Sequence, residues 1–274
     1  MPRPALNHTA RKSALLPAGF TLIELVVTIV ILGIVSVMVS VFLQRPIEGY
    51  FATTRRAQLA DMADFALRRI ARDLATAVPN SVRSDGTSME LLQTRTGGRY
   101  CNAADCGNAL LDGDNTFTVL GPNPAAVAGE FVVIGNLPAS GCDAYLAALP
   151  NRRVLPAQGA AVVPPVITFS GAPFTSTCAT ITNRFQIMVG PVTYACVGTT
   201  LWRYSGYGIF DTQRTIAQLN ALVTPAALVT NVNCAGTTLD VTSVGEGLVE
   251  LRIQLQASGE SINLYRQVKV DNTP

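Results

Sequence analysis

One carboxylate, Glu24, lies near the start of an otherwise apolar stretch that runs from Phe20 to Leu43. An ionised carboxylate inside hydrocarbon is costly unless a cation pairs with it. A cut between Gly19 and Phe20 would create a new α-amino group about one helical turn from Glu24. The acid would then have a cationic partner in its own chain or, in a better position, in the next subunit of a stack. This spacing predicts a processed N-terminus whose charge matters for assembly.

The segment 20–43 is long enough to cross a membrane, because a helix rises about 1.5 Å per residue and the hydrocarbon core is roughly 30 Å thick. The arm before it carries Arg3, Arg11 and Lys12 and no acidic residue. Under the positive-inside rule, such an arm keeps the N-terminus in the cytoplasm and sends the rest of the chain across. We therefore expect a single-pass protein with a periplasmic or extracellular globular part.

Two simpler explanations of the first 43 residues compete with processing before the apolar run. A secretory signal peptide has a shorter apolar region and a closing site of small residues, and neither feature is present. A plain signal anchor explains the length and the basic arm, but it leaves Glu24 unpaired in the hydrocarbon. Only a cut after Gly19 gives the acid a partner.

The run G19-F20-T21-L22-I23-E24-L25, with the basic leader 1–19 before it and the apolar helix behind it, resembles the processing site of type IV prepilins and type II secretion pseudopilins. The resemblance implies that a prepilin peptidase cuts after Gly19 and methylates Phe20. It also implies that Glu24 pairs with the N-terminus of a neighbouring subunit during filament assembly. The implied partners are other major and minor pilins, the peptidase and an inner-membrane assembly platform.

Beyond the membrane segment, residues 44–79 predict an amphipathic second half of the same helix. Apolar residues recur at steps of three and four and form one stripe: Leu59, Met62, Ala66, Ile70, Leu74 and Ala77. Asp64 with Arg68, and Arg69 with Asp73, are expected as i,i+4 pairs on more polar faces. Pro79 is expected to end the helix. Major pilins of the family often have a proline within the membrane half, whereas here Pro46 follows that half.

Residues 80–274, here called the head, read as short strands and loops, so the fold expected is α+β, a long helix packed on an antiparallel sheet. Strands are predicted at 89–94, 116–120, 130–134, 185–189, 192–196 and 201–204. A hairpin with one buried face is predicted around the turn 257–260, from apolar residues that alternate with polar ones: Val249, Leu251, Ile253, Leu255, Ile262, Leu264, Val268 and Val270. The proline- and glycine-rich region 135–180 is expected to be a long loop.

All six cysteines follow the membrane segment, and an oxidising compartment would let them pair. Order and spacing suggest Cys101 with Cys106, Cys142 with Cys178, and Cys196 with Cys234. A zinc site is the alternative, but it is disfavoured because the only histidine is His8 and no C-x-x-C motif occurs.

Charge and composition bound the functions of the head. Beyond Gly19 there are 17 basic and 18 acidic residues, a net charge of −1, so a nucleic-acid partner is not expected and the helix arginines read as a solvated face. The absence of histidine beyond His8 argues against Ser-His-Asp and Cys-His catalysis, and no cofactor, metal or enzymatic activity is expected.

Two local motifs in the head have a functional and a structural interpretation. Asp112 begins a calcium-like run, but the residues that follow favour a polar turn. The aromatic residues Trp202, Tyr204, Tyr207 and Phe210 could line a sugar or partner surface, and a sheet core with one exposed tyrosine is favoured.

A second resemblance covers the head. The stretches L74 to R83, P191 to C196, L201 to G208, G247 to L251 and Q267 to P274 are together similar to minor pilins of the mannose-sensitive haemagglutinin (MSHA) pilus system, of the MshO type. This resemblance implies a low-abundance subunit that primes assembly or sits near the filament tip. It implies residence in the bacterial inner membrane and then in the pilus fibre. The alternatives are a J-type minor pseudopilin of type II secretion and, in another class, a pilus-borne adhesin or DNA receptor.

Overall fold

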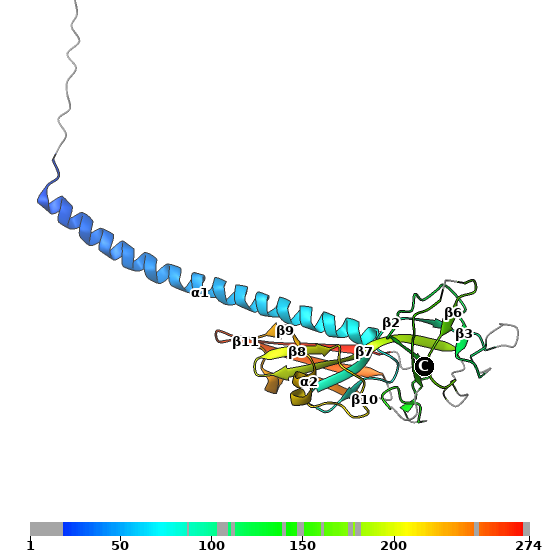
Figure 1. Ribbon diagram of the computed structural model, residues 1–274. Helices are drawn as coiled ribbons and strands as arrows, with labels where there is room; N and C mark the ends of the chain where they lie inside the picture. Colours follow the sequence, from blue (N-terminus) through cyan, green and yellow to red (C-terminus); the bar gives the residue numbers. More distant parts are fainter. Residues whose placement is uncertain are drawn as a thin grey trace, which may run out of the picture. The chain divides into compact units, whose positions relative to one another are not determined.

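A computed structural model describes the chain at 19–86, 88–102, 109–110, 113–138, 141–146, 151–159, 162–174, 178, 182–243 and 247–270. The chain divides into two compact units, Met1–Thr53 and Thr54–Pro274. The helix α1 (Leu22–Ala75) begins in the first unit and ends in the second (Figure 1). It is continuous through Pro46.

In the second unit, one side of α1 is buried against strands. Four residues of the predicted stripe are almost fully buried there: Leu59, Ala66, Ile70 and Leu74. Met62 and Ala77, also predicted, are only partly buried, and Ala63, which was not predicted, is fully buried. They pack with apolar side chains from several strands, among them β2 (Ser88–Arg99), β7 (Arg184–Val197) and β11 (Leu248–Ala257). Packing of this apolar face against the strands, rather than intrinsic helix propensity, stabilises this half of the helix.

The helix ends at Ala75, before the proline that was expected to end it. The amide of Val78 donates to the carbonyl of Leu92 over 2.8 Å, and the amide of Thr94 donates to the carbonyl of Thr76 over 2.8 Å. The chain after Ala75 therefore leaves the helix to bond with β2, since sheet pairing satisfies its backbone groups before Pro79 is reached.

The main sheet has seven antiparallel strands, with β1-β2-β7-β4-β5 in order and β8 and β9 continuing from β7. Their bounds are β1 (Arg83–Ser84), β2 (Ser88–Arg99), β4 (Phe131–Ile134), β5 (Arg152–Val154), β7 (Arg184–Val197), β8 (Thr200–Ser205) and β9 (Ala226–Thr230).

The two strands predicted at 185–189 and 192–196 are one strand, β7, and their separation was wrong. On one side, β7 pairs with β4 as far as Met188 and with β8 from Val192 onward. Pro191, which has no amide hydrogen, lies between these two partners. The missing donor therefore breaks no pair on that side, and the strand continues.

The predicted C-terminal hairpin is confirmed as β11 (Leu248–Ala257) and β12 (Glu260–Lys269), with β10 (Thr238–Ser243) on the other side of β11. Ser258 and Gly259 both have positive φ, as a tight two-residue hairpin turn requires. The apolar face of β11 predicted from the alternation is buried.

The region 135–180 contains β5 and also β6 (Val166–Thr168), which pairs with β3 (Thr116–Thr118), so the long-loop interpretation was incomplete. Phe117, Phe169 and Phe185 form the centre of a second apolar core there. Two further short helices are α2 (Ile216–Leu222) and a 3-10 turn, η4 (Cys234–Gly236).

Disulfides join Cys142 to Cys178 and Cys196 to Cys234, two of the three pairs suggested by sequence order. Cys106, the partner suggested for Cys101, lies outside the described residues. The two bridges link segments separated by 36 and 38 residues, so each closes a long loop of the head. The described chain is thus an α+β fold of the type IV pilin kind, with a long apolar helix and a disulfide-linked antiparallel head.

Candidate processing and assembly site

Gly19 and Phe20 form an open segment before the first helical residue. A side chain added at Gly19 would meet no atom within 4 Å, and Phe20 is 76% exposed. The fold of the described chain therefore does not require glycine at position 19. A requirement for glycine there has to come from a molecule that binds this segment.

Thr21 starts the helix. Its side-chain oxygen accepts a hydrogen bond from the amide of Glu24 over 3.3 Å, and its carbonyl accepts one from the amide of Leu25 over 3.1 Å. Thr21 is thus the N-cap, and Glu24 is the third residue of the helix. A Thr-x-x-Glu spacing at a helix start is a recognised capping signal, although it was not among the features predicted from the sequence.

Glu24 lies in the first turn, where the helix dipole favours negative charge. Its side chain is exposed, and among the described residues no cation lies within ion-pair distance of its carboxylate. Phe20 is four residues before it, so a free amine there would lie at the same end of the helix. The geometry keeps the carboxylate available for a cation, and the described residues do not provide one.

The helix behind this site is apolar on all sides. In its most apolar 18-residue window the mean hydropathy is 2.9, and none of the window is buried. Its large side chains from Leu22 to Leu43 remain between about half and four-fifths exposed. A helix that is apolar all round needs lipid or other helices around it. By length and composition it can cross a membrane once.

The structure does not gather the other candidate motifs into a site. Tyr204 and Tyr207 are both buried, so the expectation of one exposed tyrosine in this cluster was wrong. Trp202 and Phe210 are only partly buried. Asp112 lies outside the described residues. Among the residues that are described, no group of His, Cys, Asp and Glu side chains could hold a metal ion.

Two buried carboxylates were missed by the sequence analysis. Asp73 was expected on a polar helix face, but its side chain is only 2% exposed. It accepts hydrogen bonds from the Tyr194 hydroxyl (2.6 Å), Arg203 Nε (2.9 Å) and Gln93 Nε2 (3.3 Å). Burial, then the bond to Asp73, raises the pKa of Tyr194, so its hydroxyl stays a donor. Arg69 is the expected i,i+4 partner, and its Nε lies 3.6 Å from Asp73 Oδ1. Because Arg69 is also partly exposed, this contact is weaker than those from Tyr194 and Arg203.

Glu90 is the second buried carboxylate, with a side chain 1% exposed. It forms an ion pair with Arg83 (2.6 Å) and accepts a hydrogen bond from the Tyr207 hydroxyl (2.8 Å). Arg83 in turn stacks over the ring of Tyr145. Each carboxylate has its partners within the fold, so both networks have the character of structural ties between elements rather than of a reactive site.

A family model, the prokaryotic N-terminal methylation motif, matches residues 17–40. No curated protein and no solved structure matches the chain. The matched range contains the open Gly19-Phe20 segment, the Thr21 cap, Glu24 and most of the apolar helix. The motif implies a pilin that is processed by a peptidase and assembled with other pilin subunits. Joined to this α+β fold, it supports a type IV prepilin-like protein, a pilin or pseudopilin anchored in a membrane by its single N-terminal helix.

Proposed function

We propose that this chain is a minor type IV pilin of the MSHA kind, a low-abundance subunit that primes pilus assembly or sits at the tip of the filament. The observation that carries the proposal is an open Gly19-Phe20 segment placed directly before a capped helix whose first half is apolar and exposed. The finer assignment rests on the resemblance of the five sequence stretches named above to minor pilins of that system.

In this function, hydrolysis of the peptide bond between Gly19 and Phe20 releases the leader 1–19 and leaves a free amine on Phe20. Methylation of that amine keeps its positive charge. The Glu24 carboxylate of one subunit then pairs with the Phe20 amine of a neighbour, which reduces the penalty for burying both charges among apolar helices. The pair forms only in one axial register, so it rewards correct docking.

The head in this proposal is structural and not catalytic. The only histidine, His8, belongs to the leader, so the mature chain would have no imidazole for acid–base or nucleophilic chemistry. The basic leader supports an N-terminus in the cytoplasm, with the head in the periplasm and later on the fibre.

The first prediction is that the mature protein begins at Phe20 with a methylated amine. Intact mass and N-terminal peptide sequencing of the membrane fraction, from cells with an active prepilin peptidase, check it. Gly19→Val should block the cut. Gly33→Val is the matched control, because a side chain added at Gly33 also meets no atom within 4 Å. A mature N-terminus at Met1, or one beyond Leu43, would contradict the proposal.

Deletion of the gene distinguishes a role in pilus assembly from a role in secretion. For the pilus role, loss of this gene should lower the number of fibres per cell while secreted enzymes still reach the medium. A strain that keeps its fibres and loses secretion would instead identify the chain as a minor pseudopilin. Counting fibres by electron microscopy and measuring secreted activity in the same cultures separates the two.

A further inference from the structure

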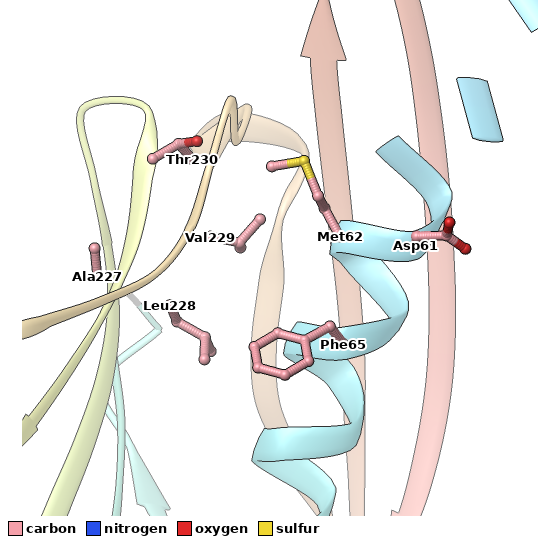
Figure 2. Close-up of a pocket in the computed structure, with 7 residues that line it drawn as sticks. All are labelled: Asp61, Met62, Phe65, Ala227, Leu228, Val229 and Thr230. Carbon is pink, nitrogen blue, oxygen red and sulfur yellow. The ribbon is translucent and has the colours of Figure 1, made fainter. Parts of the chain in front are cut away.

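Two grooves of similar volume lie along the packed half of α1, and they differ in chemistry. The first lies between α1 and β9, has a volume of about 410 Å³, and is lined mainly by apolar side chains such as Phe65 and Leu228 (Figure 2). No feature of the described residues indicates what would cover it. The second lies at the C-terminal end of the helix, has a volume of about 450 Å³, and is lined by threonines, glycines and arginines. Its polar groups indicate a class of ligand.

The second groove, here called the β2 groove, opens where β2 and β7 continue past the end of α1 (Figure 1). After the helix ends, residues 76–78 bond to the outer edge of β2 as far as Thr94. That edge is covered again from Arg99 onward, by residues 119–120. Between these covers, no described strand pairs with the outer edge of β2. The open edge spans only residues 95–98 and is closed at both ends, so it favours a compact ligand over an added strand.

Two glycines keep the floor of the β2 groove free of side chains. A Cβ at Gly97 would lie 2.7 Å from the carbonyl oxygen of Phe185, and a Cβ at Gly98 would lie 3.0 Å from the ring of the same residue. The packing of β2 on β7 therefore requires glycine at both positions. A consequence of this packing is a bare backbone between Thr96 and Arg99, which a ligand can approach closely.

Two arginines provide the charge of the groove. Arg99 of β2 and Arg184 of β7 are direct partners in the strand register, so their side chains emerge on the same face of the sheet. Both are exposed, and among the described residues that line the groove none is acidic. Like charges directly opposite each other disfavour strand pairing. An anion held by both arginines would relieve this repulsion, and guanidinium groups bind carboxylates through paired hydrogen bonds.

Two threonines provide acceptors rather than donors. Thr76 Oγ1 donates to the carbonyls of Arg72 and Asp73, and Thr94 Oγ1 donates to the carbonyl of Thr76. Because each hydroxyl proton is bonded to the backbone, the lone pairs of both oxygens are left for donors of a ligand. The C-terminal end of α1 also carries partial negative charge, which disfavours an anion there. The acidic group of a ligand should therefore lie at the arginines, and its hydroxyl groups should lie toward the helix.

We propose that the β2 groove binds an acidic saccharide, with a carboxylate between Arg99 and Arg184 and with sugar hydroxyls that donate to Thr76 and Thr94. Two cations at one end and two acceptors at the other fit a ligand that is both charged and hydroxylated, whereas a simple anion would use only the arginines. The volume lies in the range of small-ligand sites, about 300–1,000 Å³. Saccharide binding would be a further function of this subunit, beyond its part in assembly.

Isothermal titration calorimetry tests the site on the full chain in a polyoxyethylene detergent, which has no sugar headgroup. Trigalacturonic acid carries carboxylates and hydroxyls, its methyl ester keeps the sugar rings without the charge, and triglutamate keeps the charge without the sugar. Trigalacturonic acid should bind about tenfold more tightly than either control compound. Equal binding of the methyl ester would refute the role of charge, and equal binding of triglutamate would refute the saccharide class. Absence of binding by the acid would overturn the proposal.

Substitutions locate the binding site. Arg99→Gln and Arg184→Gln should each weaken the binding of trigalacturonic acid about tenfold, as expected when hydrogen bonds to a charged group are lost. Arg99→Lys keeps the charge but loses the planar fork, so its affinity should lie between these values. Arg252→Gln is the matched control and should bind normally, because Arg252 is an exposed arginine of β11, in another sheet. Affinity that is unchanged in both groove variants, or equally reduced in the control, would refute the site.

This proposal and the proposed function can fail separately. The β2 groove lies within the second unit, away from the cleavage segment in sequence. A chain that stays uncut but binds trigalacturonic acid would contradict the proposed function and support the groove ligand. A chain that is cut after Gly19 and assembles, but does not bind the acid, would contradict only the groove ligand.

Discussion

At the start of α1, the side chain of Thr21 caps the helix and the side chain of Glu24 provides a negative charge. The hydrogen bond from the Glu24 amide goes to Thr21 Oγ1, so the cap depends on the threonine side chain and on the backbone of Glu24, not on the carboxylate. The charge of Glu24 can therefore be removed without removing the cap. This separation makes the residue a clean target for substitution.

We expect Glu24→Gln to leave membrane insertion and cleavage after Gly19 intact and to lower co-assembly with other pilins about tenfold or more, because the Phe20 amine of the neighbour loses its counter-charge. Fibre counts and pilin co-purification in a strain without the native copy measure this. Glu48→Gln, at the other end of the apolar segment, is the control and should assemble normally. Normal fibres with Glu24→Gln would show that the carboxylate is dispensable.

Asp73 allows a second test at the residue scale. Asp73→Asn should destabilise the second unit by about 3 kcal/mol, because Arg203 would remain largely buried without its carboxylate. Asp64→Asn on the same helix should change stability by no more than about 0.5 kcal/mol, since its pair with Arg68 is exposed. Urea unfolding followed by tryptophan fluorescence compares them, and similar losses for both would contradict the buried-tie interpretation.

Sequence spacing alone supports a prediction for Glu24, which stays a prediction, whereas it misplaced Asp73, whose environment is determined by the tertiary fold. The position of Glu24 could be interpreted because the acid and the cleavage point are close in sequence. Asp73 was misplaced because i,i+4 spacing favours Arg69, whereas its shorter contacts come from Tyr194 and Arg203, more than a hundred residues away. No local pattern identifies such partners.

At the scale of elements, β2 and the segment leading into β4 are tied by Arg95 and Glu130. Arg95 Nε lies 2.6 Å from Glu130 Oε1, and Glu130 Oε2 also accepts the amide of Val127 over 2.9 Å. The hydrogen bond from Arg95 outweighs desolvation and lowers the pKa of Glu130. The tie therefore depends on pH.

Because the folded pKa of Glu130 is lowered, its stabilising effect is complete above the pKa of the unfolded chain and is lost as pH falls through the folded pKa. Glu130→Gln should thus be less stable than the unsubstituted chain at neutral pH. The difference in unfolding free energy between the two chains should disappear in acid, where protonated Glu130 resembles glutamine.

Urea unfolding at neutral pH and at about pH 3 checks this prediction. A difference that persists in acid would assign the effect to packing. Since Arg95 is partly exposed, a modest effect is expected.

The elements themselves were predictable where the pattern was regular. The β11–β12 hairpin follows from strict alternation around a tight turn, and the α1 stripe follows from its three- and four-residue steps. The short strands were predicted only in part: β3 and β4 were predicted, whereas β1, β5, β6, β9 and β10 were missed, because so few residues seldom show a clear period.

At the scale of the whole molecule, the two units have opposite solvent requirements. The described part of the first unit leaves its large apolar side chains exposed, whereas the second unit buries an extensive core and has two disulfides among its described residues. A fragment of residues 54–274 should therefore be soluble without detergent and unfold cooperatively, while the full chain should need detergent. Size-exclusion chromatography and thermal unfolding by circular dichroism measure this. Aggregation of the fragment in its oxidised form would show that the core depends on the first unit.

The contacts at the end of α1 also determine how a force applied along the helix is distributed over the head. Asp73 contacts β2 through Gln93, β7 through Tyr194 and β8 through Arg203, and the next residues bond to β2 through their backbone. A force applied along α1 is therefore distributed over β2, β7 and β8 and is not concentrated on one connecting loop. Under the proposed function, stretching of the fibre would have to separate the packed face of the helix and the buried ion pair together before the head could unfold.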